Sequence, residues 1–293
     1  MRDAHSMDAG DPNAEAAFRE EMEKSPGDAL PRYNLGTVLA RAGKLAEAVR
    51  FLREATELDP GRAEAHYNHG VCLCRLHRYP QAAAAFRDVL RIRPDHAKAR
   101  YNLGVALQKS GRLEEAAAAF REAVERQPDD ARALYNLGLT YAALGRDRDA
   151  IGSFREAAAV PPGHAAACAA LGAMRLRNGN VPDAIEEFRR AIRLQPKDAR
   201  SHNGMGAALY RLGRLAEAEE AFRAAVRFFP GSACANYNLG LCLLLRKDRD
   251  GISRQLSALD SLDPGMAARY EALVRSRLGT VPARPPARPR RRP

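Results

Sequence analysis

Small and hydrophobic residues alternate with polar ones along this chain in a pattern that repeats every 34 residues. With position 1 of the first copy at Ala29, positions 4, 7, 8 and 11 have the i, i+3, i+4, i+7 spacing of a helix face, and positions 20, 24 and 27 form a second such face. Position 8 is glycine in every copy: Gly36, Gly70, Gly104, Gly138, Gly172, Gly206 and Gly240. The pattern predicts seven consecutive pairs of helices over residues 29–266.

Glycine and proline punctuate each predicted pair. A glycine inside a helix costs about 0.8–1.0 kcal/mol relative to alanine, so its recurrence at position 8 predicts a close approach between the two helices, against the small residue at position 20. A glycine at position 15 of most copies is expected to end the first helix. A proline at position 32 of all seven copies is expected to stop the second helix.

This pattern resembles the tetratricopeptide repeat family over residues 29–266. The resemblance rests on the small residues at positions 8, 20 and 27 and on the proline at position 32. It implies an all-α fold, a right-handed superhelical array of helix-turn-helix repeats (an α-solenoid). The chain departs from the family at position 4, where the family often has tryptophan and this chain has none. We expect that departure to loosen the packing slightly.

The repeat register divides the chain into segments. Residues 1–28 are interpreted as a polar N-terminus with a half-repeat capping helix, in which Ala14 and Phe18 take the places of positions 20 and 24. The seven repeats are 29–62, 63–96, 97–130, 131–164, 165–198, 199–232 and 233–266. A C-terminal capping helix is expected over 267–278, because arrays of repeats need polar outer faces at their ends. The Pro/Arg-rich segment 279–293 is expected to be disordered.

Composition narrows the function classes. The formal net charge is +11, and 41 of the 47 basic residues are arginine. A GC-rich genome would produce that bias, while attraction to acidic partners or nucleic acid is the alternative interpretation. Five scattered cysteines, no apolar leader segment and no apolar run of membrane-spanning length predict a cytoplasmic protein without a membrane partner.

The stretch HYNHGVCLCRLH, residues 66–77, combines three histidines and two cysteines. In the repeat register these side chains spread over roughly 200° of one helix, so they cannot converge on one tetrahedral ion. No catalytic motif or isolated carboxylate pair occurs elsewhere in the chain. We therefore expect no metal, no cofactor and no enzymatic activity.

Function is then expected on the face of the first helices, which in this family lines the groove where partner peptides lie. Positions 2, 6 and 13 fall on one stripe of that helix. Position 6 contributes Asn34, Asn68, Asn102, Asn136 and Asn238, and position 13 contributes Arg41, Arg75, Lys109, Arg177 and Arg211. Position 2 adds Lys98 and Arg132. Asparagine can bind the backbone of an extended peptide, and the cations favour acidic side chains.

Other interpretations stay open. The asparagines could only tie neighbouring helices together, and the position-13 cations could only stabilise helix C-termini. The asparagine-containing repeats also resemble the substrate-binding arm of protein O-linked N-acetylglucosamine transferases, which predicts a recruiting arm for a separate enzyme. The five arginines after residue 283 predict at most weak, salt-sensitive nucleic-acid binding. The sequence predicts no particular partner protein or oligomeric state.

Overall fold

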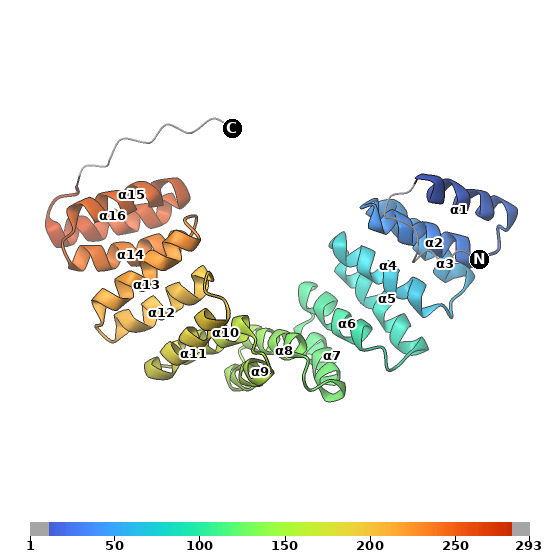
Figure 1. Ribbon diagram of the computed structural model, residues 1–293, viewed down its shortest axis with the longest axis horizontal. Coiled ribbons are helices and arrows are strands. Elements are labelled where there is room, and N and C mark those ends of the chain that lie inside the picture. The colour runs from blue at the N-terminus through green and yellow to red at the C-terminus, as the bar shows by residue number, and fades with distance from the viewer. Residues whose placement is uncertain (1–11, 283–293) are drawn as a thin grey trace. The chain divides into compact units, whose positions relative to one another are not determined.

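The computed structural model describes residues 12–282, and its regular elements over that range are all α-helices (Figure 1). The polar segment 1–11 and residues 283–293 of the predicted disordered tail lie outside the described residues. None of the described helices has the length and apolar character needed to cross a lipid bilayer. The helices are α1 (Pro12–Lys24), α2 (Ala29–Arg41), α3 (Leu45–Leu58), α4 (Ala63–Arg75), α5 (Tyr79–Ile92), α6 (Ala97–Lys109), α7 (Leu113–Arg126), α8 (Ala131–Ala143), α9 (Asp147–Ala159), α10 (Ala165–Arg177), α11 (Val181–Leu194), α12 (Ala199–Arg211), α13 (Leu215–Phe228), α14 (Ala233–Leu245), α15 (Arg249–Leu262) and α16 (Pro264–Leu278).

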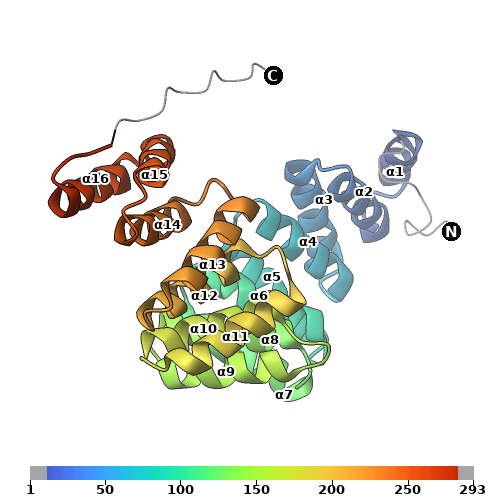
Figure 2. The same ribbon diagram turned by 60° about the vertical axis from the view of Figure 1, so that its left-hand side comes forward.

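Contacts divide the chain into two units, residues 1–153 and residues 154–293. Within each unit a helix packs mainly on its neighbours in the sequence. The first helices of successive copies also lie side by side (Figures 1 and 2). These helices are α2, α4, α6 and α8 in the first unit, and α10, α12 and α14 in the second. Sequential packing of paired helices is the architecture of an α-solenoid. The all-α prediction is confirmed for the described residues.

The turn between the two helices of a copy has the same geometry in all seven copies. The first helix ends at position 13, and the backbone N–H of position 16 returns to the carbonyl of position 11, as from Lys44 to Leu39 (2.9 Å). The N–H of position 15 bonds to the carbonyl of position 12, which completes a Schellman motif. Position 15 therefore has a positive φ in every copy, including His77 (φ 59°) and Lys247 (φ 55°), where glycine is absent.

Side chains cap the start of most first helices. The residue just before the helix accepts one or two backbone N–H bonds, which satisfies donors that the helix itself leaves unpaired. These caps are Asp28, His96, Asp130, His164, Asp198 and Ser232.

The close approach predicted at position 8 is confirmed, but it involves mainly position 24. A Cβ atom added at Gly70 would lie 2.8 Å from the Phe86 ring, and one added at Gly104 would lie 2.7 Å from Phe120. Both rings are fully buried. The alanines at position 20 are also buried, so they allow the second helix to come near, while the large side chain at position 24 fills the space that the glycine leaves.

Polar residues at position 4 join four of the seven copies to the copy before, at a position where the family often has tryptophan. Asn236 donates to the carbonyl oxygen of Pro230 (3.0 Å). A ring nitrogen of His202 lies 2.9 Å from the carbonyl oxygen of Pro196. His66 and Arg100 bond in the same way to the carbonyls of Pro60 and Pro94. In these copies a hydrogen bond to a backbone carbonyl of the preceding copy takes the place of the packing that a tryptophan ring would provide.

Helix α16 closes the C-terminal end by supplying an aromatic ring that the seventh copy lacks. Position 24 of that copy is Leu256, and the atom nearest to a Cβ added at Gly240 would belong to Tyr270 of α16, at 2.6 Å. Tyr270 is fully buried and donates to the Gly240 carbonyl (2.7 Å). The helix begins at Pro264, three residues before the expected boundary, because Asp263 caps it at once. This proline starts a helix as well as following one.

The left-handed turn yields a prediction about stability. A residue with a side chain in this conformation costs about 1–2 kcal/mol relative to glycine. We expect Lys247→Gly to raise the free energy of unfolding by about 1 kcal/mol. Gly213→Ala, at the same position of the sixth copy where an added Cβ meets nothing within 4 Å, should lower it by a similar amount. Urea denaturation of both variants measures this, and changes of the same sign would contradict it.

The closing helix yields a second prediction. Removing the buried ring in Tyr270→Ala should destabilise the second unit by about 3–5 kcal/mol. Tyr270→Phe should cost only about 1 kcal/mol, because it loses one hydrogen bond while the Gly240 carbonyl keeps its helical partner. Phe229→Ala is the matched control, because Phe229 is 58% exposed and its loss should cost little. Hydrogen exchange over α14–α16 would localise the effect. Unchanged protection in Tyr270→Ala would show that the ring does not hold this end together.

Candidate functional site

The asparagines at position 6 bond to the preceding copy through their amide nitrogens. Asn102 Nδ2 donates to the Tyr67 hydroxyl (3.1 Å), and Asn136 Nδ2 donates to the Tyr101 hydroxyl (2.9 Å). Each bond links the first helices of neighbouring copies, so the asparagines do have the structural role considered from the sequence. No donor to the carbonyl oxygen of either amide is found among the described residues, which leaves these oxygens as acceptors.

The remaining asparagines follow the same geometry with different partners. Asn68 donates to the Thr37 hydroxyl (3.2 Å), and Asn238 donates to the side-chain oxygen of Asn203 (3.0 Å). Asn34 is buried in α2, with 8% of its surface exposed. It therefore offers less surface to a ligand than the other four.

The cations at position 13 lie at the C-terminal ends of the first helices, where the helix dipole favours positive charge. Arg75 donates to the carbonyl of Ala40 (2.9 Å) and Arg211 to that of Leu176 (2.6 Å), each in the preceding copy. Lys109 is exposed, and no ion pair involves it among the described residues. Arg41 and Arg177 are exposed at equivalent places in α2 and α10.

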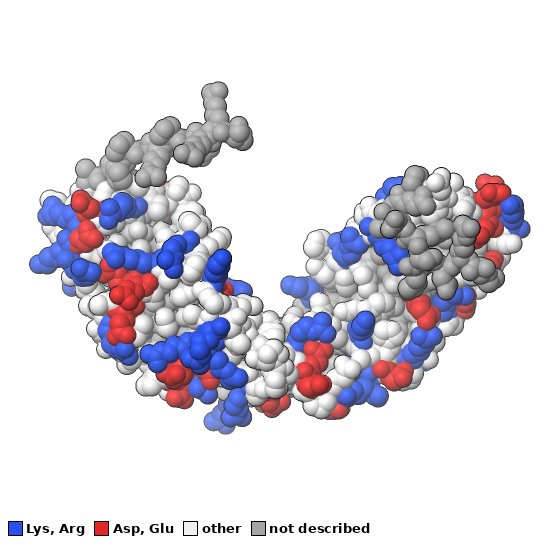
Figure 3. Space-filling view, in the orientation of Figure 1, with Lys and Arg blue, Asp and Glu red and all other residues white. Residues whose placement is uncertain are grey.

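The position-2 cations lie near the opposite end of the helices. Arg132 is 5.3 Å from the centre of the Tyr101 ring and 3.4 Å from Asp130. Lys98 is exposed and lines, with Asn102 and Arg132, a cavity of about 160 Å³ along α4, α6 and α8. On the side of the molecule shown in Figure 3, basic and acidic side chains are interspersed. On that side the cations do not gather into one large positive patch.

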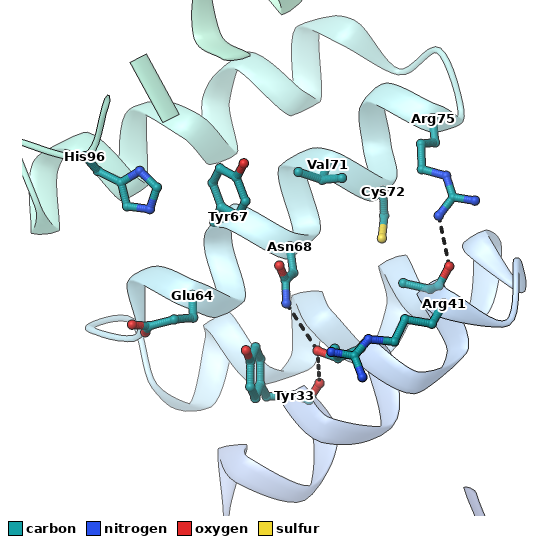
Figure 4. A pocket seen from close by; sticks show the side chains of 11 residues that line it. Tyr33, Arg41, Glu64, Tyr67, Asn68, Val71, Cys72, Arg75 and His96 are labelled. Atoms are coloured by element: carbon teal, nitrogen blue, oxygen red, sulfur yellow. Dashed lines mark hydrogen bonds between the residues drawn. The ribbon is translucent and has the colours of Figure 1, made fainter. Parts of the chain in front are cut away.

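A larger cavity of about 360 Å³ lies between α2 and α4 (Figure 4). Tyr33 and Tyr67 form its middle, and Arg41 and Arg75 stand at one end. The other end holds His96, which stacks on Tyr67 (5.1 Å between ring centres). It also holds Glu64, whose carboxylate pairs with Arg93 (2.7 Å). The cavity is therefore aromatic in its middle and cationic at the C-terminal ends of its helices.

Titratable groups around this cavity do not have the character of nucleophiles. Cys72 lines it but is 1% exposed, and burial raises the pKa of its thiol to about 11. Its thiolate is therefore scarce at neutral pH. The cavity can bind by stacking, hydrogen bonding and charge.

The His- and Cys-rich stretch of residues 66–77 divides among different environments. His66 bonds to a backbone carbonyl, as described above, and His77 lies in the left-handed turn. His69 faces a separate cavity between the second helices α3 and α5. Among residues 12–282 no group of three or more His, Cys, Asp or Glu side chains is placed to hold a metal ion.

The sequence reasoning missed the tyrosines at position 5. Tyr67 and Tyr101 accept the asparagine bonds, and Tyr33 and Tyr67 line the larger cavity. The signal was present in the sequence, because tyrosine directly precedes asparagine in the recurring fragment YNLG, which reads YNHG in the second copy. Their bonding could not be read from it, because Tyr67 and Tyr101 accept from asparagines that lie 35 residues later in the chain.

Paired helices stacked in sequence define a helical repeat protein of the α-solenoid class. The chain belongs to the tetratricopeptide repeat (TPR) family. Family models described as tetratricopeptide repeat match residues 29–62 and 169–233. The model of the cilia and flagella-associated protein 70 middle TPR-like domain matches residues 60–161. No curated protein sequence matches the chain.

Several solved structures are similar to this chain. YrrB, a TPR protein with an unusual peptide-binding site, is 29% identical, with 63% of this chain and 95% of YrrB covered and a TM-score of 0.55. MamA of Desulfovibrio magneticus RS-1 is 28% identical, with 64% and 98% covered and a TM-score of 0.53. The pilF protein of Pseudomonas aeruginosa is 22% identical, with 73% and 98% covered and a TM-score of 0.64, which shows the fold alone.

The half-buried His69 yields a prediction about acid stability. Its pKa is lowered to about 4, first by burial and then by the positive charge of His66 and Arg53. Histidine in an unfolded chain has a pKa of about 6.5, so the stabilisation from neutral His69 is complete above that pH and is lost as the pH falls toward 4.

We expect wild type to lose about 2 kcal/mol more of its free energy of unfolding between pH 7 and pH 4.5 than His69→Leu does. Leucine is the residue at position 7 of most copies. Urea denaturation at the two pH values measures both losses, and the carboxylates common to both proteins cancel in the comparison. Equal losses would mean that His69 does not titrate abnormally.

Proposed function

We propose that this protein is a non-catalytic interaction scaffold, and that the first-helix face of its N-terminal unit (α2, α4, α6 and α8) binds an extended acidic segment of a partner protein. The observation that carries the proposal is the combination on one face of amide oxygens that accept no hydrogen bond and cations that have no acidic partner among the described residues. Arg75, Lys98 and Lys109 are exposed, and no acidic side chain pairs with any of them among the described residues.

The side-chain amides of Asn68, Asn102 and Asn136, which we call the amide row, suit the main chain of a bound peptide more than a particular side chain. The nitrogens of Asn68, Asn102 and Asn136 are held by the preceding copy, which fixes the orientation of each amide. Their oxygens can then accept N–H bonds from an extended peptide without further ordering, which lowers the entropy cost of binding. The sequence suggested both donor and acceptor roles, and the proposal keeps only the acceptor.

The similarity to YrrB supports this assignment, because that protein has the same fold and a peptide-binding site. The buried, protonated Cys72 supports a binding role over a catalytic one for the larger cavity. The recruiting-arm hypothesis and weak nucleic-acid binding by the tail stay predictions from the sequence, and cytoplasmic localisation does as well.

Charge reversal on this face tests the proposal. A fluorescein-labelled peptide of ten residues, alternating glutamate and glycine, offers an extended main chain with acidic side chains and no bulky apolar ones. We expect it to bind wild type at roughly 150 mM salt, and Lys98→Glu/Lys109→Glu to weaken binding at least about tenfold. Fluorescence anisotropy measures the affinity.

The matched control is Arg121→Glu/Arg126→Glu, which changes the net charge equally on the second helix α7, where both arginines are exposed. We expect little change in affinity for this control. Equal weakening in both double variants would show that the peptide responds only to net charge, and the first-helix face would not be the binding surface.

A further inference from the structure

The second unit contains an apolar cavity that none of the preceding surfaces includes. It has a volume of about 230 Å³ and lies along α12, α14 and α16. We call it the terminal pocket, and its lining residues are Tyr210, Leu241, Leu244, Leu245, Leu273 and Leu278, with Lys247 and Arg277. Pockets for small molecules are usually about 300–1,000 Å³. The terminal pocket is smaller and matches a single bulky side chain.

The pocket arises where the repeat pattern changes. Position 13 is a cation in five copies but Leu245 in the seventh, where it is 49% exposed. Helix α16 is held by Tyr270 against Gly240, and it presents Leu273 and Leu278 beside Leu245 without covering them. Leu241, Leu273 and Leu278 are partly buried, and Leu244 is buried. One exposed leucine by itself is ordinary, but apolar side chains gathered around one concavity are typical of a binding surface.

The rim of the pocket is positive. Lys247 and Arg277 are exposed, and no ion pair involves either of them among the described residues. Lys247 also occupies the left-handed position that is glycine in five of the seven copies. A side chain there costs conformational free energy, and strain of this kind is found where a residue has a functional role.

Charge complementarity selects the occupant. The C-terminal segment of this chain, ARPPARPRRRP, carries five arginines and no acid, so the rim cations repel it. An acidic segment is attracted by the same two cations, and one apolar side chain within it would find the leucine walls.

We propose that the terminal pocket binds a bulky apolar side chain, leucine or phenylalanine, that is flanked by acidic residues in a partner protein. Lys247 and Arg277 contact the flanking carboxylates, and Leu241, Leu245 and Leu273 enclose the side chain. This site lies entirely in the second unit and uses no residue of the amide row, so it stands independently of the function proposed for the first unit.

Fluorescein-labelled peptides of matched charge test the pocket. DEDLFEDE carries the apolar pair, DEDAAEDE replaces it with alanine, and KRKLFKRK reverses the charge. By anisotropy with the full chain, DEDLFEDE should bind at least tenfold more tightly than either of the others. Equal binding of DEDLFEDE and DEDAAEDE would overturn the proposal.

Variants locate the binding. Leu245→Glu, Lys247→Gly and Arg277→Gln should each weaken DEDLFEDE binding at least fivefold. Arg269→Gln, on an exposed arginine of α16 outside the pocket, should not. Lys247→Gly is expected to be the more stable protein, so its loss of binding could not come from unfolding. Full affinity in all three pocket variants would overturn the proposal.

Two further measurements decide between occupants and between sites. Lys98→Glu/Lys109→Glu should keep the preference for DEDLFEDE over DEDAAEDE, and loss of that preference would assign it to the first unit. Sedimentation of wild type and Leu245→Glu should give the same mass. A dimer that Leu245→Glu dissociates would show that a second copy covers the pocket, and DEDLFEDE binding gained only after deletion of 283–293 would show that the tail does.

Discussion

The contact between the glycine at position 8 and the large side chain at position 24 is the constraint on which the helix hairpins of the first, second, third, fifth and sixth copies depend. A Cβ atom at Gly104 would lie 2.7 Å from the Phe120 ring, a distance that real side chains do not tolerate. The helices can therefore approach closely around one buried ring, and a chain with no tryptophan still fills its core. At the C-terminal end the same glycine receives Tyr270 from α16, so the array closes by the contact that builds it.

Much of this fold could be predicted because local rules and the repeat agree. The helix pairs follow from periodicity, and the turn follows from glycine at position 15. Other features depend on how copies stack, which one copy cannot reveal. The bonds from His202 and Asn236 to proline carbonyls join different copies, so the sequence showed only a missing tryptophan. The early start of α16 at Pro264 required knowing that Asp263 would cap it directly.

For the candidate surface, the sequence could likewise predict which residues share a face but not which atoms bond between copies. Helical geometry places positions 2, 6 and 13 on one stripe, and the structure places Asn68, Arg41 and Arg75 around one cavity. Whether asparagine serves the fold or a ligand could not be separated from the sequence. In the structure the amide nitrogen bonds to the preceding copy, while no donor within residues 12–282 reaches the amide oxygen. A residue can thus be structural through one atom and still offer a hydrogen-bond acceptor through another.

The first-helix face of the N-terminal unit and the terminal pocket differ because the seventh copy has different residue types at positions 13 and 15. In the second and sixth copies the cation at position 13, Arg75 or Arg211, bonds to a carbonyl near the C-terminal end of the first helix of the preceding copy. Histidine or glycine takes the left-handed position of the turn in these copies. In the seventh copy position 13 is Leu245 and the cation, Lys247, stands in the turn itself. For the isolated chain both choices are unfavourable, since one exposes apolar surface and the other strains the backbone. Both become favourable when an apolar group covers the leucine and an acid neutralises the lysine, so the cost to the fold can be recovered only in a complex.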